Sequence, residues 1–236
     1  MKLAIMQPYL FPYIGYFQLV AAVDKFVFYD DVNFIKNGWI NRNRLFLAGD
    51  VRYITVPLSG ASSFLKINEV GVQPGDIWRR KIIESMRQSY SKAPYFNNIK
   101  TLVSEILFLE ENKIANLAKA SIVAVCNYLD LDTQFVFTST TYENKYLNSA
   151  ARIIDICRQE KADSYFNLSG GKELYDESLF KSNGIDLYFM ESQLKKYQQF
   201  SEEFQPGLSI IDVLMFNDIN AVREMVIANN INHENT

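Results

Sequence analysis

Histidine and cysteine are scarce in this sequence, and their scarcity excludes several classes of enzyme. Of the 236 residues, one is histidine, His233, in the polar tail 229–236. Ser–His–Asp and Cys–His catalysis, and His-based zinc sites, need an imidazole held by a rigid scaffold, so we expect none of them. The two cysteines, Cys126 and Cys157, fall inside helix-like patterns, as reduced core thiols do. We therefore predict no metal site and leave any cofactor open.

Long apolar runs and an excess of positive charge are also missing. No apolar run approaches the ~20 residues that cross a bilayer, and Met1 leads directly into the strand-like Lys2–Met6. We therefore expect no membrane span, no signal peptide and a cytoplasmic location. Lys and Arg number 24 against 27 Asp and Glu, a net charge of −3, so no global charge attracts nucleic acid. The 48% apolar residues are enough to bury a sizeable core.

What is present at the N-terminus is a strand–helix–strand pattern. Lys2–Gln7 is a short apolar run that Pro8 ends, and Ile14–Val23 is compatible with a helix. Lys25–Tyr29 (KFVFY) is rich in aromatic and β-branched residues and predicts a buried strand. A unit of this length predicts two parallel strands joined by a crossover helix.

The rest of the chain predicts an α/β fold of mostly parallel, Rossmann-like type. The 45–72 region predicts short strands, with a hairpin at Ala48-Gly49-Asp50 and a strand at Leu65–Val72. Helical periodicity dominates about 76–129, as an insertion or a small second lobe of one domain over 1–236. Strands and helices then alternate, which is typical of an α/β sheet. These segments are strands 134–139, 164–167 and 186–190 and helices 145–159, 177–183 and 209–228.

A stretch rich in tyrosine and proline, Met6–Tyr16, directly follows the first strand. Ligands of open α/β sheets bind beyond the carboxyl ends of the strands, where a helix N-terminus presents free N–H groups. A glycine here lets the backbone approach a ligand. We interpret as candidate site residues Gln7, Tyr13, Gly15 and Tyr16. The alternative is a tight turn whose tyrosines pack across the top of the sheet.

Two adjacent carboxylates, Asp30 and Asp31, follow the second strand. At a strand terminus an aspartate can hold a ribose hydroxyl, an amine or Mg²⁺. We therefore take both, together with Tyr13, as candidate catalytic residues. The alternative is that one aspartate caps a turn and the other is solvated.

Asn33–Arg44 (NFIKNGWINRNR) combines cations, amides and an aromatic ring without an acidic residue. Cations bind phosphate or carboxylate, amides bind sugar or base, and an indole offers a stacking face. The candidate ligand-binding residues in this loop are Lys36, Trp39, Asn41, Arg42 and Asn43. The alternative is a solvated loop anchored by Trp39, with Arg42 locked to an acid as support for the fold.

A second glycine-containing loop follows the strand at 164–167. Its residues Ser169, Gly170, Gly171 and Lys172 can wrap backbone N–H groups around an anion, with the lysine adding charge. The spacing differs from that of a Walker A loop. The alternative is an ordinary left-handed turn.

Nearly the whole chain, from Met6 to about Ala228, resembles the WbqC-like family. The resemblance is carried by MQPYLFPYIGYFQLV, DKFVFYDDVNFIKNGWINRNR, YLNSAARIIDICRQEKADSYFNLSGGKELYD and LSIIDVLMFND. Membership implies a cytosolic role in modifying sugars of O-antigen and other surface polysaccharides. It does not specify a reaction.

A local similarity joins the first strand–helix–strand unit to the HUP-type nucleotidyltransferases and class I aminoacyl-tRNA synthetases. In those enzymes an H-x-G-H signature opens the helix; here Tyr13-Ile14-Gly15-Tyr16 stands in its place. Tyrosine can donate a hydrogen bond but carries no positive charge at neutral pH. The similarity therefore implies nucleotide or nucleotide-sugar binding and leaves adenylation open.

Together these observations favour a transferase acting on a nucleotide-linked sugar, by acyl or aminoacyl transfer to an amino sugar or by a nucleotidyl-type reaction. In this hypothesis Lys36, Arg42 and Lys172 neutralise phosphate. The alternative is a non-catalytic nucleotide-sugar-binding or scaffold protein of the same pathway. Nucleic-acid binding is disfavoured by the net charge and by the lack of a second basic stripe. The oligomeric state stays open.

Overall fold

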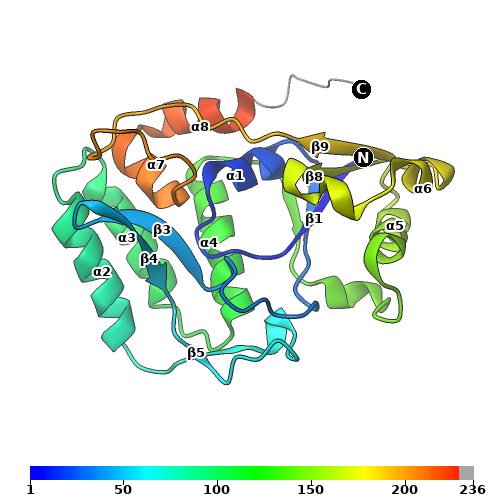
Figure 1. The fold of residues 1–236 in the computed structure, drawn as a ribbon, viewed down its shortest axis with the longest axis horizontal. Helices are drawn as coiled ribbons and strands as arrows, with labels where there is room; N and C mark the ends of the chain where they lie inside the picture. Colours follow the sequence, from blue (N-terminus) through cyan, green and yellow to red (C-terminus); the bar gives the residue numbers. More distant parts are fainter. Residues whose placement is uncertain (229–236) are drawn as a thin grey trace.

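The computed structural model describes residues 1–228, so His233 and the tail 229–236 lie outside the described residues. A five-stranded sheet with only parallel pairings forms its centre, in the order β7-β2-β1-β8-β9 (Figure 1). The strands are β1 (Lys2–Met6), β2 (Lys25–Phe28), β7 (Gln134–Val136), β8 (Ser164–Leu168) and β9 (Asp186–Met190). The chain therefore extends the sheet from β1 to β7, then adds β8 and β9 on the other side of β1. The predicted Rossmann-like α/β class is confirmed.

The first crossover helix is α1 (Ile14–Ala21), which joins β1 to β2 as the sequence predicts. All its residues but Ala21 are buried, because the helix lies between the sheet and a second layer of helices. The N–H of Tyr29 donates to the carbonyl of Met6 at 2.9 Å, which continues the pairing of the two strands to the sheet edge. The residues that follow β1 and β2 thus emerge side by side.

Alternate side chains of the central strands enter two separate hydrophobic cores, as the period of two residues requires. Leu3, Ile5 and Val27 face one core, which contains α5 (Ser149–Gln159) and α6 (Glu177–Ser182). Ala4, Phe26 and Phe28 face the other core with α1. Both faces of the sheet are therefore covered, and this explains the continuous apolar runs of its strands.

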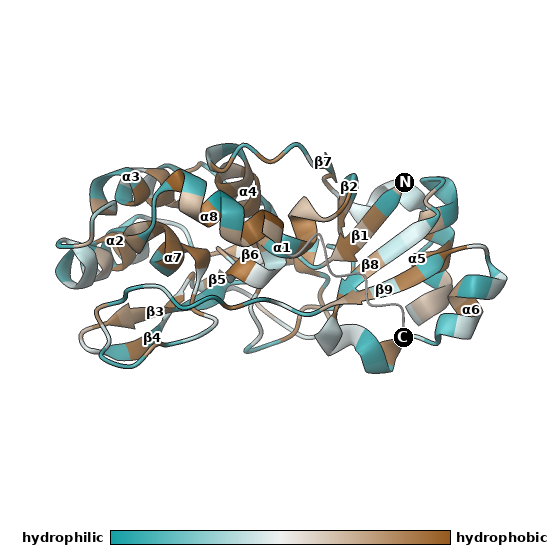
Figure 2. Cartoon of the chain, turned by 90° about the horizontal axis from the view of Figure 1, so that it is seen from above, coloured by the Kyte–Doolittle hydropathy of each residue, from teal (hydrophilic) through white to brown (hydrophobic). Residues whose placement is uncertain are grey.

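The larger core extends away from the sheet into a helical part (Figures 1 and 2). Its helices are α2 (Ile77–Tyr90), α3 (Phe96–Leu107), α4 (Ile114–Tyr128), α7 (Ile210–Phe216) and α8 (Ile219–Ile227). They pack with a hairpin of β3 (Arg42–Leu47) and β4 (Asp50–Thr55). Its two loop residues, Ala48 and Gly49, both have positive φ, as a type I′ turn requires.

Two sequence predictions differ from the structure. Leu65–Val72 is a 3₁₀ turn, η1 (Ile67–Glu69), followed by β6 (Gly71–Val72), which forms a two-stranded sheet with β5 (Leu58–Ser59). The Glu69 carboxylate accepts from the N–H of Lys66 at 2.7 Å and closes the turn, which stops an extended strand. The predicted helix 209–228 is two helices, because Asp218 caps the second by accepting from Ala221 N–H at 2.9 Å.

The remaining connections are a 3₁₀ turn η2 (Ser139–Tyr142) after β7 and another, η3 (Ser169–Leu174), after β8. The 191–208 segment, which joins β9 to α7, has no regular secondary structure. It runs across α1, where Gln18 and Gln193 exchange two hydrogen bonds of 3.0 Å. This segment therefore reaches from the sheet to the helical part.

Candidate functional site

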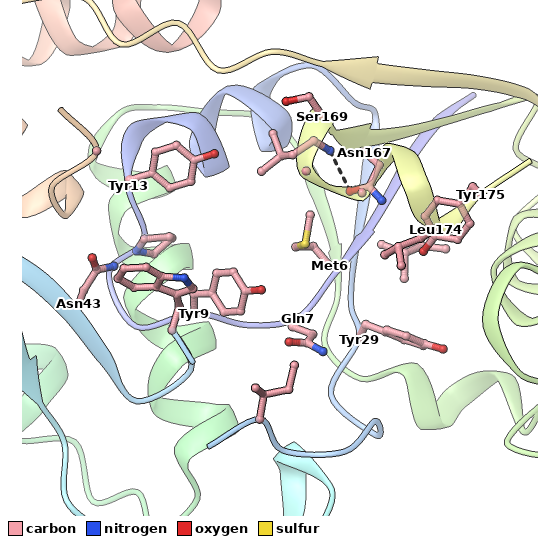
Figure 3. Close-up of a pocket in the computed structure, with 18 of the residues that line it drawn as sticks. Met6, Gln7, Tyr9, Tyr13, Tyr29, Asn43, Asn167, Ser169, Leu174 and Tyr175 are labelled. Atoms are coloured by element: carbon pink, nitrogen blue, oxygen red, sulfur yellow. Dashed lines mark hydrogen bonds between the residues drawn. The ribbon is translucent and has the colours of Figure 1, made fainter. Parts of the chain in front are cut away.

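A cavity of about 690 Å³ opens at the carboxyl ends of β1 and β8 (Figure 3). These strands are neighbours in the sheet but are separated in the chain, because strand order reverses between them. At such a reversal the connections leave toward opposite faces of the sheet, and the crevice between them is where ligands of open α/β folds bind. The volume lies in the range of small-molecule sites.

The first wall of the cavity is the stretch that follows β1, with Met6, Gln7, Tyr9 and Tyr13 among its lining residues. The stretch turns sharply at Phe11, whose φ is +39°. Asn43 stabilises that turn from β3, because its amide nitrogen donates to the carbonyls of Leu10 (3.0 Å) and Phe11 (2.8 Å). The hairpin therefore fixes the shape of this wall.

The second wall comes from the hairpin and the loop before it, through Ile35, Trp39, Asn43 and Arg44. Arg44 donates from Nη2 to the carbonyl of Gly207 at 3.0 Å, and Gly207 also lines the cavity. The Arg44 Nε is buried and has no hydrogen-bond partner among the described residues. A buried N–H without an acceptor is rare in folded proteins, so this N–H is one donor of the Arg44 guanidinium that the described residues leave unsatisfied.

The third wall is the loop after β8. Asn167 uses its side-chain oxygen to accept from Leu168 N–H at 2.8 Å, which bends the chain into η3 (Figure 3). A Cβ on Gly171 would lie 2.7 Å from the Asn167 amide nitrogen, so glycine is needed for this close approach. Ser169 and Gly170 line the cavity beside them. The loop is a 3₁₀ turn, and neither of its glycines has positive φ, which excludes the left-handed turn considered from the sequence.

The far end of the cavity is apolar and aromatic, with Tyr29, Leu174 and Tyr175 on its surface (Figure 3). The guanidinium of Arg152 lies 4.9 Å from the centre of the Tyr29 ring. Burial raises the pKa of Tyr29 and, in the same way, that of Tyr175. Both phenols are therefore neutral donors at physiological pH.

The described lining residues offer recognition groups and very few groups for acid–base chemistry. Arg44 is the one charged residue among them, and none has a carboxylate, thiol or imidazole. Among the polar groups of the lining that have no hydrogen-bond partner among the described residues are the Gln7 amide, the Ser169 and Tyr9 hydroxyls and the Trp39 indole N–H. Tyr13 shares a hydrogen bond of 2.8 Å with Ser192. The arrangement suits a polar ligand with flat or ring-shaped parts.

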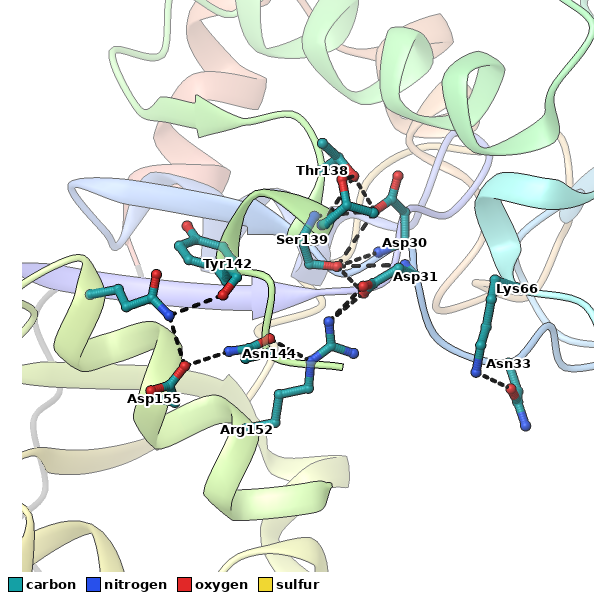
Figure 4. A network of polar contacts seen from close by, with 12 residues as sticks. Asp30, Asp31, Asn33, Lys66, Thr138, Ser139, Tyr142, Asn144, Arg152 and Asp155 are labelled. Atoms are coloured by element: carbon teal, nitrogen blue, oxygen red, sulfur yellow. Dashed lines mark hydrogen bonds and ion pairs between the residues drawn. The ribbon is translucent and has the colours of Figure 1, made fainter. Parts of the chain in front are cut away.

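Asp30 and Asp31 lie outside this lining, in a buried polar network beyond the carboxyl end of β2 (Figure 4). Asp30 forms an ion pair of 2.6 Å with Lys119 of α4 and accepts from Thr138 at 2.8 Å. Asp31 accepts from Arg152 Nη2 on both carboxylate oxygens, at 2.6 and 2.7 Å. Each carboxylate is thus neutralised by a cation from a helix on its own side of the sheet.

The other candidates from the sequence separate into two groups. Those that line the cavity are Gln7, Tyr13, Trp39, Asn43, Ser169, Gly170 and Gly171. Those outside the lining are Gly15, Tyr16, Lys36, Asn41, Arg42 and Lys172. Lys36 and Lys172 are exposed and follow the lining residues Ile35 and Gly171 in the chain.

Several of the second group have structural partners. Tyr16 is buried and donates to the Gln7 carbonyl at 2.9 Å. Asn41 donates to the Val56 carbonyl at 2.9 Å across the end of the hairpin. A Cβ on Gly15 would lie 2.1 Å from Ser192 Oγ, so this glycine makes room for the 191–208 segment.

Sequence reasoning missed four lining residues that shape the cavity: Tyr29, Arg44, Leu174 and Tyr175. Arg44 belongs to the same basic stretch as Arg42, and the pattern alone does not distinguish them. Tyr29 directly precedes Asp30 at the end of β2, and it lines the cavity where the two aspartates do not.

No group of three or more His, Cys, Asp or Glu side chains within residues 1–228 is placed to hold a metal ion. None of the helices in that part of the chain is long and apolar enough to cross a membrane.

Comparison with known proteins identifies a matching family and a relative of the chain. Residues 7–224 match the WbqC-like protein family, a span that contains every lining residue of the cavity except Ile5 and Met6. The chain is 31% identical over 216 residues to the uncharacterized protein Rv1507c of Mycobacterium tuberculosis (strain ATCC 25618 / H37Rv). That similarity covers 90% of this chain and 92% of the relative. No solved structure matches the chain.

Proposed function

The chain belongs to the WbqC-like protein family, and on that premise we propose that it binds a nucleotide-linked sugar in the cavity between β1 and β8. The proposal places the protein in the cytoplasm, in surface-polysaccharide biosynthesis. The observation that carries it is the composition of the lining. Five aromatic rings and three amide side chains surround the cavity, together with one arginine. They are Tyr9, Tyr13, Tyr29, Trp39 and Tyr175, then Gln7, Asn43 and Asn167, and Arg44.

Each of these groups suits one part of such a ligand. Aromatic rings stack on a nucleobase or on the apolar face of a sugar. Amides and hydroxyls exchange hydrogen bonds with sugar hydroxyls, and the Gln7 and Ser169 side chains are unpaired among the described residues. A guanidinium binds phosphate through two parallel hydrogen bonds. The position at the strand-order reversal is where dinucleotides bind in related topologies.

A second candidate is an enzyme that transfers an acyl or aminoacyl group to an amino sugar. In this reaction the sugar amine attacks the carbonyl of an activated acyl donor, a C–N bond forms, and the bond to the donor's leaving group breaks. The amine proton has to leave, and Tyr13 and Ser169 are hydroxyl groups in the lining that can relay it. For Asp30 or Asp31 to act instead, the carboxylate has to leave its ion pair with Lys119 or Arg152. The lack of a carboxylate in the lining favours recognition without turnover.

The proposal is tested with UDP-N-acetylglucosamine, dTDP-glucose and GDP-mannose as probes. A ligand that binds only the native state raises the melting temperature, so at least one probe is expected to raise it. Gln7→Ala and Ser169→Ala remove side chains that have no partner to lose, and each is expected to weaken that probe roughly three- to tenfold in calorimetry. Gln88→Ala, on the exposed side of α2, is the matched control and is expected to change nothing.

Two results would contradict the proposal. One is that none of the three nucleotide sugars stabilises the unmodified protein at millimolar concentration. The other is that a probe binds with equal affinity to the unmodified protein and to both cavity variants. Incubating the protein with UDP-glucosamine, whose amine is free, and acyl-CoA donors, followed by mass spectrometry of the nucleotide sugar, distinguishes the transferase from the binding protein.

A further inference from the structure

Four side chains form a stack at the hairpin side of the cavity, with two aromatic rings between two arginines. We call Arg42, Tyr53, Trp39 and Arg44, in that order, the Arg–aromatic ladder. The Arg42 guanidinium carbon lies 4.3 Å from the centre of the Tyr53 ring, and that of Arg44 lies 5.5 Å from the Trp39 ring. The two rings are 6.0 Å apart. Trp39 and Arg44 line the cavity, so the ladder leads from its interior to the surface.

The register of the hairpin places this ladder on one face. Arg44 pairs directly with Tyr53, and Arg42 pairs with Thr55. Side chains alternate between the two faces of a strand, so these residues share a face, while Arg52 points to the opposite one. The rings remain accessible, with Trp39 38% and Tyr53 47% exposed. Aromatic side chains exposed this way beside a cavity are available to contact a ligand ring.

Neither arginine of the ladder is neutralised by a carboxylate among the described residues. Arg42 donates to the carbonyls of Gly38 (3.1 Å) and Asn37, and Arg44 donates to that of Gly207. Carbonyl groups orient a guanidinium but leave its charge in place. The buried Nε–H of Arg44 is a further donor, and no acceptor among the described residues bonds to it. Charge and geometry together indicate an anionic group at this point.

We infer that the ladder binds the nucleoside diphosphate part of the ligand, which orients the sugar toward the opposite end of the cavity. The diphosphate contacts Arg44, and the base contacts the exposed parts of the Trp39 and Tyr53 rings, with Arg42 at the outer end. The neutral wall around Asn167 and Tyr175 then receives the sugar. Both arginines lie at the hairpin end, and Arg44 is the charged residue of the described lining, so the reverse orientation takes the phosphates away from it. This inference rests on the proposed function and specifies the direction in which the ligand binds.

The experiment is calorimetry with UDP, dTDP and GDP, with the three uncharged nucleosides, and with free N-acetylglucosamine. Arg44→Gln is expected to weaken the best-bound diphosphate at least tenfold, about 1.4 kcal/mol. Tyr53→Leu is expected to weaken it at least fivefold, about 1 kcal/mol, since the base loses an aromatic partner. Arg52→Gln carries the same change of charge on the other face of the hairpin and is expected to alter affinity less than twofold. Arg44→Lys keeps the charge without the planar fork and serves if Arg44→Gln does not fold.

The outcomes separate this inference from the proposed function. If a nucleotide sugar binds the unmodified protein and the Arg44 and Tyr53 variants bind it equally tightly, the inference is wrong and the proposed function stands. If Arg52→Gln weakens binding as much as Arg44→Gln, the effect is one of overall charge and the ladder is not the site. If no nucleoside diphosphate and no nucleotide sugar binds, both are wrong. Unchanged affinity for free N-acetylglucosamine in the ladder variants is required by the proposed orientation.

Discussion

Replacing Asp31 by asparagine removes the negative partner of a buried ion pair and leaves the Arg152 charge behind. The two side chains are 0% and 5% exposed, and Arg152 Nη2 lies 2.6 and 2.7 Å from the two carboxylate oxygens. Breaking such a pair from one side costs about 3–5 kcal/mol, because the remaining charge is buried without compensation. A protein of this kind has about 5–15 kcal/mol of total stability, so the loss is a large fraction of it.

Urea unfolding at 25 °C measures this loss. With an m-value of about 3 kcal/mol per molar, the midpoint of Asp31→Asn is expected to fall by about 1–1.7 M. Asp130→Asn is the control, because Asp130 pairs with Arg223 at the surface and has a positive φ that asparagine tolerates. Its expected cost is below about 1 kcal/mol. Ligand affinity is expected to be unchanged in any Asp31→Asn protein that remains folded, since Asp31 does not line the cavity.

The double variant Asp31→Asn, Arg152→Gln is expected to cost less than the sum of the two single changes, because it removes both charges. A cost of less than 1 kcal/mol for Asp31→Asn, together with loss of ligand binding, would refute this reasoning. That result would assign Asp31 to the ligand instead of to the fold.

Three further predictions concern other parts of the molecule. Gly15→Ala puts a Cβ 2.1 Å from Ser192 Oγ and is expected to lower the melting temperature by roughly 2–10 °C. The control Gly170→Ala has open space around the new Cβ and is expected to leave the melting temperature unchanged. Equal melting temperatures of the two variants would contradict this prediction. Burial raises the pKa of Asp212, so the folded protein holds its proton to higher pH than the unfolded chain. In urea unfolding, the free energy of unfolding of the unmodified protein minus that of Asp212→Asn is therefore expected to fall as the pH rises above 3.8. A difference that increases with pH would refute this prediction. Burial raises the pKa of Cys126 and Cys157 to about 12, so a thiol reagent at pH 8 should label neither without denaturant, and rapid labelling of the folded protein would be inconsistent with their burial.

The parts of the fold that were predictable are those set by short-range chemistry. Pro8 ends the first strand, alternating aromatic residues form the second, and Ala48-Gly49 closes the hairpin, each by a local backbone preference. The predicted strand at Leu65–Val72 was wrong because the Glu69 carboxylate closes a turn on the Lys66 N–H, and apolar content alone does not reveal that turn.

In the candidate site, residues predicted from the sequence lie on all three walls, but the partners of the acidic pair were not predicted. Lys119 and Arg152 lie 89 and 121 residues from the aspartates they neutralise, and no local pattern connects them. Arg42 contacts Tyr53, whereas Arg44 contacts Gly207 and lines the cavity. No local pattern in the sequence reveals these contacts, so the sequence does not distinguish the two arginines. Long-range pairing, in both cases, decides which charged side chain is structural and which faces the cavity.

The central claim is that the cavity between β1 and β8 holds a nucleotide-linked sugar. The most direct measurement is a crystal structure of the protein soaked with whichever of the three nucleotide-sugar probes raises its melting temperature most. We expect density for the ligand between Gln7 and Asn167, with its phosphates at Arg44 and its base beside Trp39. Density for the ligand at any other surface, with the cavity holding only solvent, would contradict the account.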